Sequence, residues 1–276
     1  MDFDYQLVGK IGSMALIRKE DMDIDYNIFS RLGAELQPGM IWVSSGATEI
    51  GRIDYMRRNG GRDIGGDPED DKTDYAAQGQ AILMENYRRY IAPEYSLRQV
   101  LVEHQHFNDP DKREHIRRLL LRAAAQRAIP IINYNDPVSS DENRKMELAH
   151  LRAQDTHAVE CVDNDETAAV VSRLVRAKYL LIMTSADGIY LDRHDPSTLV
   201  PTITGPDAEA TVAQIRRLMD HCEGASRQGA GGARAKLFYT IEPVLMGTTV
   251  IIGHGRYRIS ELLQGSGPCT RIGIGL

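Results

Sequence analysis

The chain has 276 residues, of which 42% are hydrophobic and 26% are charged, and its formal net charge is −6. This length permits one large α/β domain or two modest ones, either of which can bury a substantial core. The negative charge disfavours broad nonspecific binding to nucleic acid, and the sequence contains no run of eighteen apolar residues that would form a membrane span.

Short apolar runs alternate with helix-length amphipathic segments along the chain. This pattern predicts βαβ units and a mostly parallel sheet, which is an α/β fold. The predicted strands cover residues 5–10, 40–44, 99–103, 129–133, 179–184 and 249–253. The predicted helices cover residues 25–36, 75–90, 113–127, 166–177, 208–220 and 233–246. Trp42 lies within a predicted strand and is expected to pack in the core, while the acidic, glycine-containing segment 60–74 is predicted to be a mobile, solvated loop.

The first ten residues, MDFDYQLVGK, lack the basic and then apolar regions of a signal peptide, so a cytoplasmic location is expected. Three cysteines, Cys161, Cys222 and Cys269, lie far apart in no CxxC or Cys/His spacing. This fits a reducing compartment and argues against a zinc site. The HxH pattern of His104 and His106 has no evident third ligand, so structural roles are expected for both and no metal-ligating set is assigned.

Two early segments combine glycine with charged or hydroxyl groups at predicted strand ends. Gly12 permits a close backbone approach to an anion, and Lys10 can neutralise phosphate charge, although such a pair is also common at ordinary strand ends. After the second predicted strand, Ser45 and Gly46 can hold a carboxylate or phosphate at a helix start. A simple turn with a helix cap is the alternative interpretation there.

A cluster of short polar side chains occupies the middle of the sequence. Its members are Asn133, Asn135, Asp136, Asp163, Asn164 and Asp165. One such residue is enough to cap a helix, so the excess indicates function. Carboxylates do not attract an anionic phosphate, and they would instead orient a lysine, hold magnesium through water or bind an ammonium group. Asparagine can donate to a carboxylate and accept from an ammonium, which suits a zwitterionic substrate.

The segment GAGGARAKL at 229–237 places glycines before a predicted helix that carries Lys236 in its first turns. Loop amides at a helix start, together with one mobile cation, form a suitable site for nucleotide phosphates. The segment matches neither GxxxxGK[ST] nor GxGxxG in the required context, which disfavours a P-loop and a dinucleotide-binding fold. Lys10 and Lys236 would supply positive charge to one phosphate site from opposite ends of the sequence.

Seven segments in order resemble the amino acid kinase family, and within it most closely the glutamate 5-kinases that open proline biosynthesis. They are KIGS at 10–13, VSSGA at 43–47, AAQGQ at 76–80, IPIINYNDPV at 129–138, DNDETAA at 163–169, LLIMTSADGIY at 180–190 and GAGGARAKL at 229–237. The resemblance spans nearly the full length. The order and spacing of the segments are more specific than any one of them.

The resemblance implies a three-layer αβα sandwich with a central, mostly parallel sheet. It implies a single domain, 1–276, whose N-terminal part binds the acceptor and whose C-terminal part binds nucleotide. In contrast to many glutamate 5-kinases, no RNA-modification-type domain is expected at the C-terminus. The implied reaction is ATP-dependent phosphorylation of the side-chain carboxylate of a small amino acid, L-glutamate to L-glutamate 5-phosphate, assisted by Mg²⁺. The implied partners are the amino acid, ATP and further copies of the chain in a dimer or tetramer, with no nucleic acid or membrane.

The resemblance also implies roles for individual residues. Lys10 and Lys236 would contact the transferring phosphate, and Asp165 would hold the two lysines in place. The residues implied for acceptor binding are Ser45, Gly46, Asp136 and Asn164. The residues implied for nucleotide binding are Lys10, Gly12, Ser13, Thr184, Ser185, Ala230, Gly231, Gly232 and Lys236.

The sequence departs from the family pattern at several positions. Ser185 stands where the family has aspartate, and Ala230 and Ala233 replace residues of the family's GTGGM, which bears on nucleotide preference. The charged segment 143–162 is longer than the corresponding family loop beside the acceptor site, so a different acid or a role in assembly stays open. Two other function classes also remain open, namely a kinase of another small acid, carbamate or phosphorylated acceptor, and a noncatalytic protein that binds nucleotide or amino acid.

Overall fold

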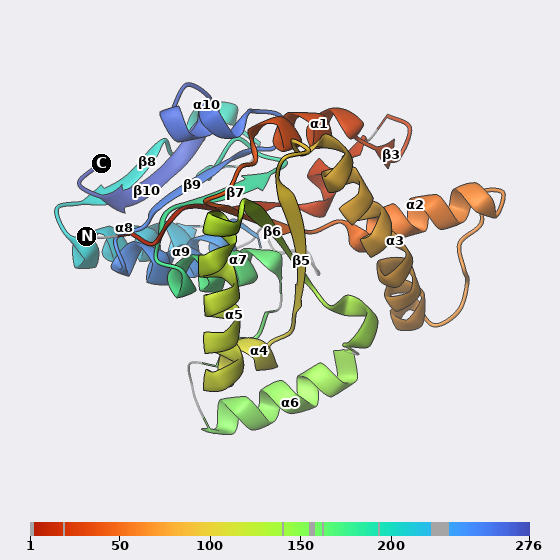
Figure 1. The fold of residues 1–276 in the computed structure, drawn as a ribbon. Coiled ribbons are helices and arrows are strands. Elements are labelled where there is room, and N and C mark those ends of the chain that lie inside the picture. The colour runs from red at the N-terminus through yellow and green to blue at the C-terminus, as the bar shows by residue number, and fades with distance from the viewer. Residues whose placement is uncertain are drawn as a thin grey trace.

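A central sheet of eight strands organises the chain, with strand order β5-β6-β4-β1-β7-β9-β10-β8 (Figure 1). The computed structural model describes residues 3–18, 20–139, 141–154, 158–161, 163–192, 194–221 and 232–276. The strands of this sheet are β1 (Tyr5–Ile11), β4 (Met40–Ser44), β5 (Ser96–Val102), β6 (Ala128–Tyr134), β7 (Ala177–Thr184), β8 (Thr202–Gly205), β9 (Thr249–His254) and β10 (Cys269–Ile274). The six strands from β5 to β9 in this order run parallel, and only the pairing of β9 with β10 is antiparallel.

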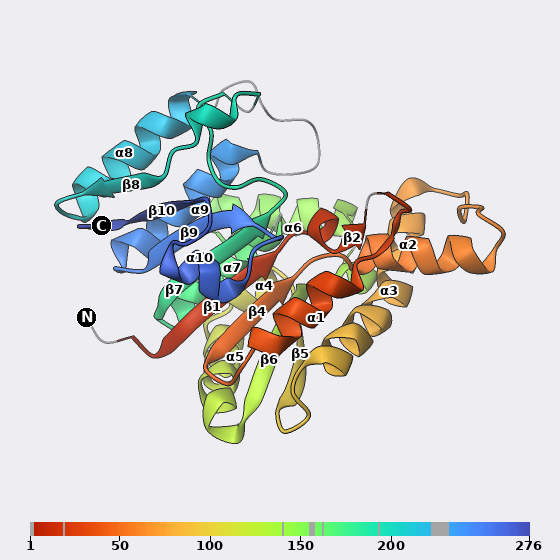
Figure 2. The ribbon, with the colours of Figure 1, turned by 90° about the horizontal axis from the view of Figure 1, so that it is seen from above.

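Helices cover both faces of this sheet, which makes a three-layer αβα sandwich (Figure 2). One face carries α5 (Pro110–Ala123), α7 (Asn164–Leu174), α8 (Ala208–His221) and α9 (Ala233–Leu245). The other face carries α1 (Tyr26–Glu35), α2 (Ala47–Arg58), α3 (Pro68–Tyr90) and α10 (Ile259–Gln264). The remaining elements are α4 (Gln105–Asn108), α6 (Asp141–Gln154) and the small antiparallel pair β2 (Ile17–Arg18) and β3 (Asp23–Ile24). The predicted mostly parallel α/β sandwich is therefore confirmed.

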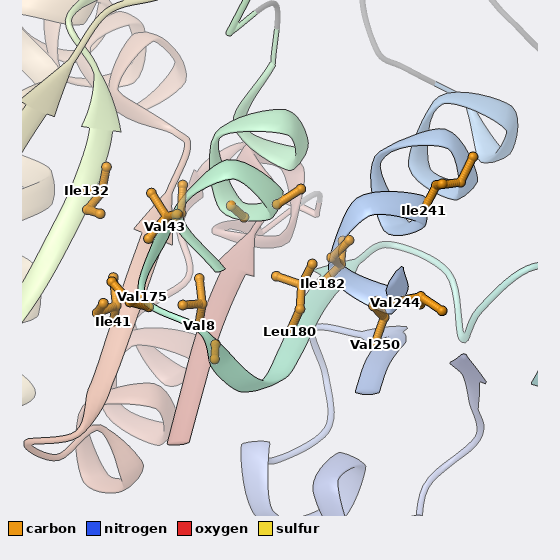
Figure 3. Packing of buried hydrophobic residues seen from close by; sticks show 14 of the residues in the cluster. Val8, Ile41, Val43, Ile132, Val175, Leu180, Ile182, Ile241, Val244 and Val250 are labelled. Carbon is orange, nitrogen blue, oxygen red and sulfur yellow. The ribbon is translucent and has the colours of Figure 1, made fainter. Parts of the chain in front are cut away.

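The side chains of the central strands alternate between the two hydrophobic clusters, one on each face of the sheet. In β4, Ile41 and Val43 pack into the cluster beneath α5 and α7, whereas Met40 and Trp42 pack into the cluster beneath α1 and α3. Figure 3 shows Ile41 and Val43 beside the neighbouring strands of the first cluster. Successive side chains of a strand point to opposite faces, so a strand buried on both faces needs an unbroken apolar run. Trp42 is fully buried, in agreement with its expected packing role.

Two segments predicted to be loops contain helix. The helix α3 begins at Pro68, within the predicted loop 60–74, because the Asp67 side chain accepts hydrogen bonds from the amides of Glu69 and Asp70. An aspartate cap, a proline in the first turn and three acidic residues behind it are helix-start signals rather than a solvated charge run. The prediction of a loop at 143–162 is also wrong for residues 143–154, because these residues belong to α6.

Helices α2 and α3 pack at very close distance through glycine. A Cβ added to Gly79 would lie 1.8 Å from the carbonyl oxygen of Ala47, and one added to Gly51 would lie 1.8 Å from the carbonyl oxygen of Tyr75. No other residue fits where two backbones approach this closely. The close packing sets the middle of α3 against the first residue of α2, beside the carboxyl end of β4. Within the described ranges, no helix has the length and apolar character to cross a membrane.

Candidate active site

The carboxyl ends of four neighbouring parallel strands meet at one edge of the sheet. The pairing register aligns Ile11 of β1 with Ser44 of β4 and with Met183 of β7, and it aligns Thr184 of β7 with His254 of β9. Open α/β sheets bind ligands outside this edge, because the loops and helix starts that follow the strands gather there. The predicted site segments at the ends of β1, β4 and β7 are therefore brought together.

A buried carboxylate joins the two lysines at this edge. The Asp165 Oδ1 atom lies 2.6 Å from Lys10 Nζ, and the Asp165 Oδ2 atom lies 2.5 Å from Lys236 Nζ. Only 2% of Asp165 and 7% of Lys10 are exposed to solvent. Lys10 comes from β1 and Lys236 from the second turn of α9, so two ammonium groups from distant parts of the chain converge on one side chain.

The start of α7 holds this carboxylate in place. The Asp163 side chain caps the helix by accepting hydrogen bonds from the amides of Asp165, at 2.7 Å, and Glu166, at 3.0 Å. Burial alone would raise the pKa of Asp165, but the ammonium groups of Lys10 and Lys236 outweigh burial and hold that pKa below its usual value. Burial and the neighbouring Asp165 charge raise the pKa of Asp163. The two carboxyls therefore differ in the protonation state that their surroundings favour.

Three of the four predicted acceptor residues lie together: Asn164 bonds to Ser45, and Gly46 follows Ser45 in the chain. The Nδ2 atom of Asn164 donates to Ser45 Oγ at 2.9 Å and to Asn133 Oδ1 at 3.0 Å. Gly46 adopts a φ of +108° as it begins α2, a conformation in which glycine is favoured. Asp136 starts the short 3-10 helix η3 (Asp136–Val138), which packs against α3.

The predicted nucleotide residues surround the ends of β1 and β7. Gly12 donates its amide hydrogen to the carbonyl of Met183 at 3.1 Å, which fixes the turn that follows β1 and leads to Ser13 in the 3-10 helix η1 (Ser13–Ala15). Thr184 accepts from the amide of Ala186 at 2.9 Å, and the Ser185 between them is exposed. On the other side, Gly232 is the N-cap of the helix that carries Lys236. Ala230 and Gly231 lie outside the described residues.

Two buried side chains of α3 support the site and are absent from the predicted site residues. Gln80 accepts a hydrogen bond from Asn133 Nδ2 at 2.9 Å, and the Tyr87 hydroxyl bonds to Ser44 Oγ at 2.8 Å and to the Trp42 indole at 3.1 Å. Two sequence signals could have indicated Gln80, namely its place in the AAQGQ segment at 76–80 and a glutamine on the apolar side of a predicted helix. Nothing in the sequence indicates the contacts of Tyr87.

The HxH histidines make local contacts. His104 is buried and its Nε2 atom lies 2.9 Å from Glu147 of α6, while His106 Nδ1 accepts from the amide of Glu103 at 2.9 Å. In the part of the chain that the structure describes, no three His, Cys, Asp or Glu side chains are grouped so that they could hold a metal ion.

Comparison with known proteins agrees with this geometry. The model of the family described as the amino acid kinase family matches residues 6–254. A glutamate 5-kinase of Shouchella clausii is 30% identical over 202 residues, which cover 72% of this chain and 49% of that protein. A glutamate 5-kinase of Geobacillus kaustophilus is 27% identical over 283 residues, which cover 98% of this chain and 67% of that protein. The chain thus spans about half to two thirds of the length of these relatives.

Solved structures show the same fold at low sequence identity. A carbamate kinase from Giardia superposes with a TM-score of 0.59 at 14% identity, covering 98% of this chain and 99% of the other. A UMP kinase from Ureaplasma parvum superposes with a TM-score of 0.54 at 11% identity, covering 99% of this chain and all of the other. At this identity the likeness extends to the arrangement of the sheet and helices alone.

Proposed function

Because the chain belongs to the amino acid kinase family, we propose that it transfers the γ-phosphoryl group of ATP to the side-chain carboxylate of a small amino acid, with L-glutamate as the acceptor. The product would be L-glutamate 5-phosphate, the acyl phosphate that begins proline biosynthesis. The similarity to glutamate 5-kinases supports this acceptor. A homo-oligomeric state and a cytoplasmic location are part of the same proposal.

The observation that carries the proposal is the bridge of Lys10 and Lys236 by Asp165. The ammonium groups of the buried Lys10 and the partly buried Lys236 would repel each other, and one carboxylate between them offsets that repulsion. A carboxylate carries one negative charge, so the two ammonium groups around it keep a net positive charge. The bridge therefore presents two positive charges at the edge of the sheet where a transferring phosphoryl group would develop negative charge.

The proposed reaction needs no general base. One oxygen of the γ-carboxylate forms a bond to the γ-phosphorus of ATP while the bond from that phosphorus to the β,γ-bridging oxygen breaks. The bond electrons leave with ADP, and no proton is removed from the acceptor, because a carboxylate is already a nucleophile. Catalysis then rests on positioning and on charge stabilisation by Lys10 and Lys236.

On the acceptor side, the proposed ligands are Ser45, Gly46, Asp136 and Asn164. The Ser45 hydroxyl and the Gly46 amide stand at the start of α2, where the helix dipole favours a carboxylate. Asp136 supplies negative charge for the α-ammonium group. Asn164 is held by Ser45 and Asn133, so its carboxamide is already oriented.

On the nucleotide side, Gly12, Ser13, Thr184, Ser185 and Gly232 are proposed to line the ATP site, together with Ala230 and Gly231. The site fits Mg²⁺ that would arrive with the nucleotide, since Mg²⁺ usually keeps several waters and is held by substrate phosphates together with only one or two carboxylates, and the carboxyls of Asp163 and Asp165 lie at the start of α7. Bound in this way, Mg²⁺ would neutralise charge on the β- and γ-phosphates.

A coupled ADP-release assay with hydroxylamine present tests the proposal. The acceptors to compare are L-glutamate, L-aspartate, N-acetyl-L-glutamate and carbamate, because hydroxylamine converts an acyl phosphate to a coloured hydroxamate. We expect ADP and hydroxamate in equal amounts with L-glutamate. If another acid forms the acyl phosphate and glutamate does not, the acceptor assignment is wrong. If no acid drives ADP release, transfer to a carboxylate is wrong, which leaves a kinase of a phosphorylated acceptor or a noncatalytic binding protein.

A further inference from the structure

A chain of side-chain amides runs behind the acceptor residues from α3 to α7. Asn133 Nδ2 of β6 donates to Gln80 Oε1 at 2.9 Å. Asn164 Nδ2 in turn donates to Asn133 Oδ1 at 3.0 Å and to Ser45 Oγ at 2.9 Å. Gln80 is therefore two hydrogen bonds away from Asn164, although it lies on a helix in the opposite layer of the fold.

One backbone group fixes the direction of the whole chain. The amide of Tyr134 donates to Asn133 Oδ1 at 2.9 Å. A backbone N–H can only donate, so the oxygen of Asn133 must face it and the nitrogen must face Gln80. Gln80 then has to present its oxygen to Asn133, and Asn164 has to present its nitrogen. The amide nitrogen of Gln80 and the amide oxygen of Asn164 consequently point out of the chain.

These two outward atoms are buried and unsatisfied. Among the described residues, neither Gln80 Nε2 nor Asn164 Oδ1 has a hydrogen-bond partner, and both are shielded from solvent. Only 8% of Gln80 is exposed. A buried polar atom without a partner costs free energy, so native proteins rarely keep one without a reason. Each of the two atoms therefore lacks the partner that would offset this cost.

The packing of α3 places Gln80 beside the acceptor residues. Its neighbour Gly79 touches the backbone of Ala47, the residue after Gly46. The same helix packs against η3, which begins with Asp136. Gln80 therefore lies on a helix that packs against the elements carrying Gly46 and Asp136, and Asn164 bonds directly to Ser45.

We propose that Gln80 is a specificity-determining residue that donates a hydrogen bond from Nε2 to the α-carboxylate of the acceptor, while Asn164 Oδ1 accepts from its α-ammonium group. One unsatisfied donor and one unsatisfied acceptor match the two charged groups of an unmodified α-amino acid. This inference rests on the proposed function and narrows it, because carbamate has no carboxylate besides the reacting one, and an N-acylated acid offers Asn164 one uncharged N–H in place of an ammonium group. Gln80 would select the substrate without touching the phosphoryl group.

The test replaces the Nε2 donor of Gln80 while keeping the oxygen that accepts from Asn133. Gln80→Glu retains an oxygen for Asn133 Nδ2 and sets a second oxygen against the α-carboxylate. The two acceptors to compare are L-glutamate and its α-carboxamide, which keeps the reacting γ-carboxylate. We expect Gln80→Glu to raise KM for glutamate about 100-fold. The KM for the α-carboxamide should change less than about fivefold, because its N–H can donate to the new carboxylate. The KM for ATP should stay constant.

Two controls separate selectivity from loss of folding. Gln78→Glu makes the same change on the partly exposed side of α3, where Gln78 Nε2 donates to Asp54, and it should leave the ratio of the two KM values unchanged. Gln80→Met keeps the volume without a charge, and it should raise KM for glutamate about tenfold with an unchanged KM for ATP. A Gln80→Met enzyme with a wild-type KM for glutamate would overturn the inference.

The outcomes also distinguish this inference from the proposed function. If both Gln80 variants lose stability but leave the ratio of the two KM values unchanged, an internal water satisfies the two atoms and the inference is wrong while the kinase function stands. If glutamate protects the wild type against thermal unfolding without forming hydroxamate, the proposed function is wrong. The inference is then tested with the ratio of the dissociation constants for L-glutamate and its α-carboxamide. If neither amino acid binds, both proposals fail.

Discussion

Asp165 is the residue on which the arrangement of the site depends. It contacts one ammonium group with each of its two oxygens while almost fully buried. Removing one member of a buried charge network leaves the others uncompensated, which is more costly than deleting the whole network. A neutral substitution at this position therefore affects both folding and chemistry.

The Asp165→Asn variant should lose about 3–5 kcal/mol of unfolding free energy at pH 7, and its turnover should fall at least about 100-fold because Lys10 and Lys236 repel each other. Urea denaturation and the coupled ADP assay measure the two effects. Asp163→Asn is the matched control, since asparagine also caps helices and the change removes a carboxyl whose pKa is raised by burial and by Asp165. A stable Asp165→Asn variant with normal turnover would contradict the proposed bridge.

The pH dependence of stability should follow from the same carboxyl. The pKa of Asp165 is lower in the folded protein than in the unfolded chain, where it is about 3.9. Its stabilisation is therefore fully present above the unfolded pKa and disappears as the pH falls through the folded pKa. We expect the difference in unfolding free energy between wild type and Asp165→Asn to be constant from pH 7 to pH 5 and to shrink below about pH 4. A difference that grows with acidification would show the opposite sign of shift.

In this proposal the Lys236 ammonium group contacts the transferred phosphoryl group and does not contact the amino acid. Lys236→Ala should reduce kcat much more than it weakens glutamate binding, because its contact strengthens as charge develops on the phosphoryl group. Steady-state kinetics and glutamate titration by calorimetry separate the two effects. Near-normal turnover in this variant would remove Lys236 from the mechanism.

At the scale of elements, the contact between α2 and α3 sets the acceptor side of the site. Gly79→Ala should destabilise the protein by about 3 kcal/mol or more, because its Cβ would overlap the Ala47 carbonyl and neither helix backbone can yield cheaply. Gly12→Ala is the matched variant, since its Cβ would meet nothing nearer than Lys10 Nζ at 3.6 Å. Chemical denaturation should show a change within about 1 kcal/mol for Gly12→Ala. Equal losses in both variants would contradict the steric account.

Helix α6 is attached to the rest of the fold by one buried side chain among those whose burial is described, and by polar contacts such as that of Arg144 over the Tyr134 ring. Among its residues 144–153, whose burial is described, Leu148 alone is buried, and Glu147 pairs with His104. We expect Leu148→Ala to increase amide hydrogen exchange across α6 while exchange in β1 and β7 stays unchanged, because local opening needs only local contacts to be lost. Mass spectrometry of exchanged peptides measures this. Faster exchange throughout the sheet would mean that α6 is part of the cooperative core.

At the scale of the whole molecule, one site draws on both ends of the chain. Lys10 lies in the first strand and Lys236 in the last long helix, so the site forms only when the sheet is complete. A nonhydrolysable ATP analogue with Mg²⁺ at 100 times its dissociation constant should add about 2.7 kcal/mol to the unfolding free energy. Lys236→Ala should lose most of this gain at the same concentration, and denaturant melts with and without ligand test it.

Sequence periodicity predicted the central strands well, because apolar runs and alternation are local properties. The strand at Met40–Ser44 was predicted with its observed bounds, and the prediction for β7 differed only at its first residues. The acidic segments were predicted less well, because the strength of an aspartate cap depends on a few specific hydrogen bonds and not on average composition. The Asp67 cap starts α3 inside the segment 60–74, which was predicted to be a loop.

The sequence by itself determined the class of fold, the family and the charged residues at strand ends, since these depend on local patterns and on the order of short segments along the chain. Only the tertiary structure decided which atoms meet. Asn164 reaches Ser45 across 119 residues and Gln80 reaches Asn133 across 53, and such contacts depend on how helices pack on the sheet. The direction of the amide chain follows from a single backbone N–H, which is common to every residue except proline and so leaves no mark in the sequence.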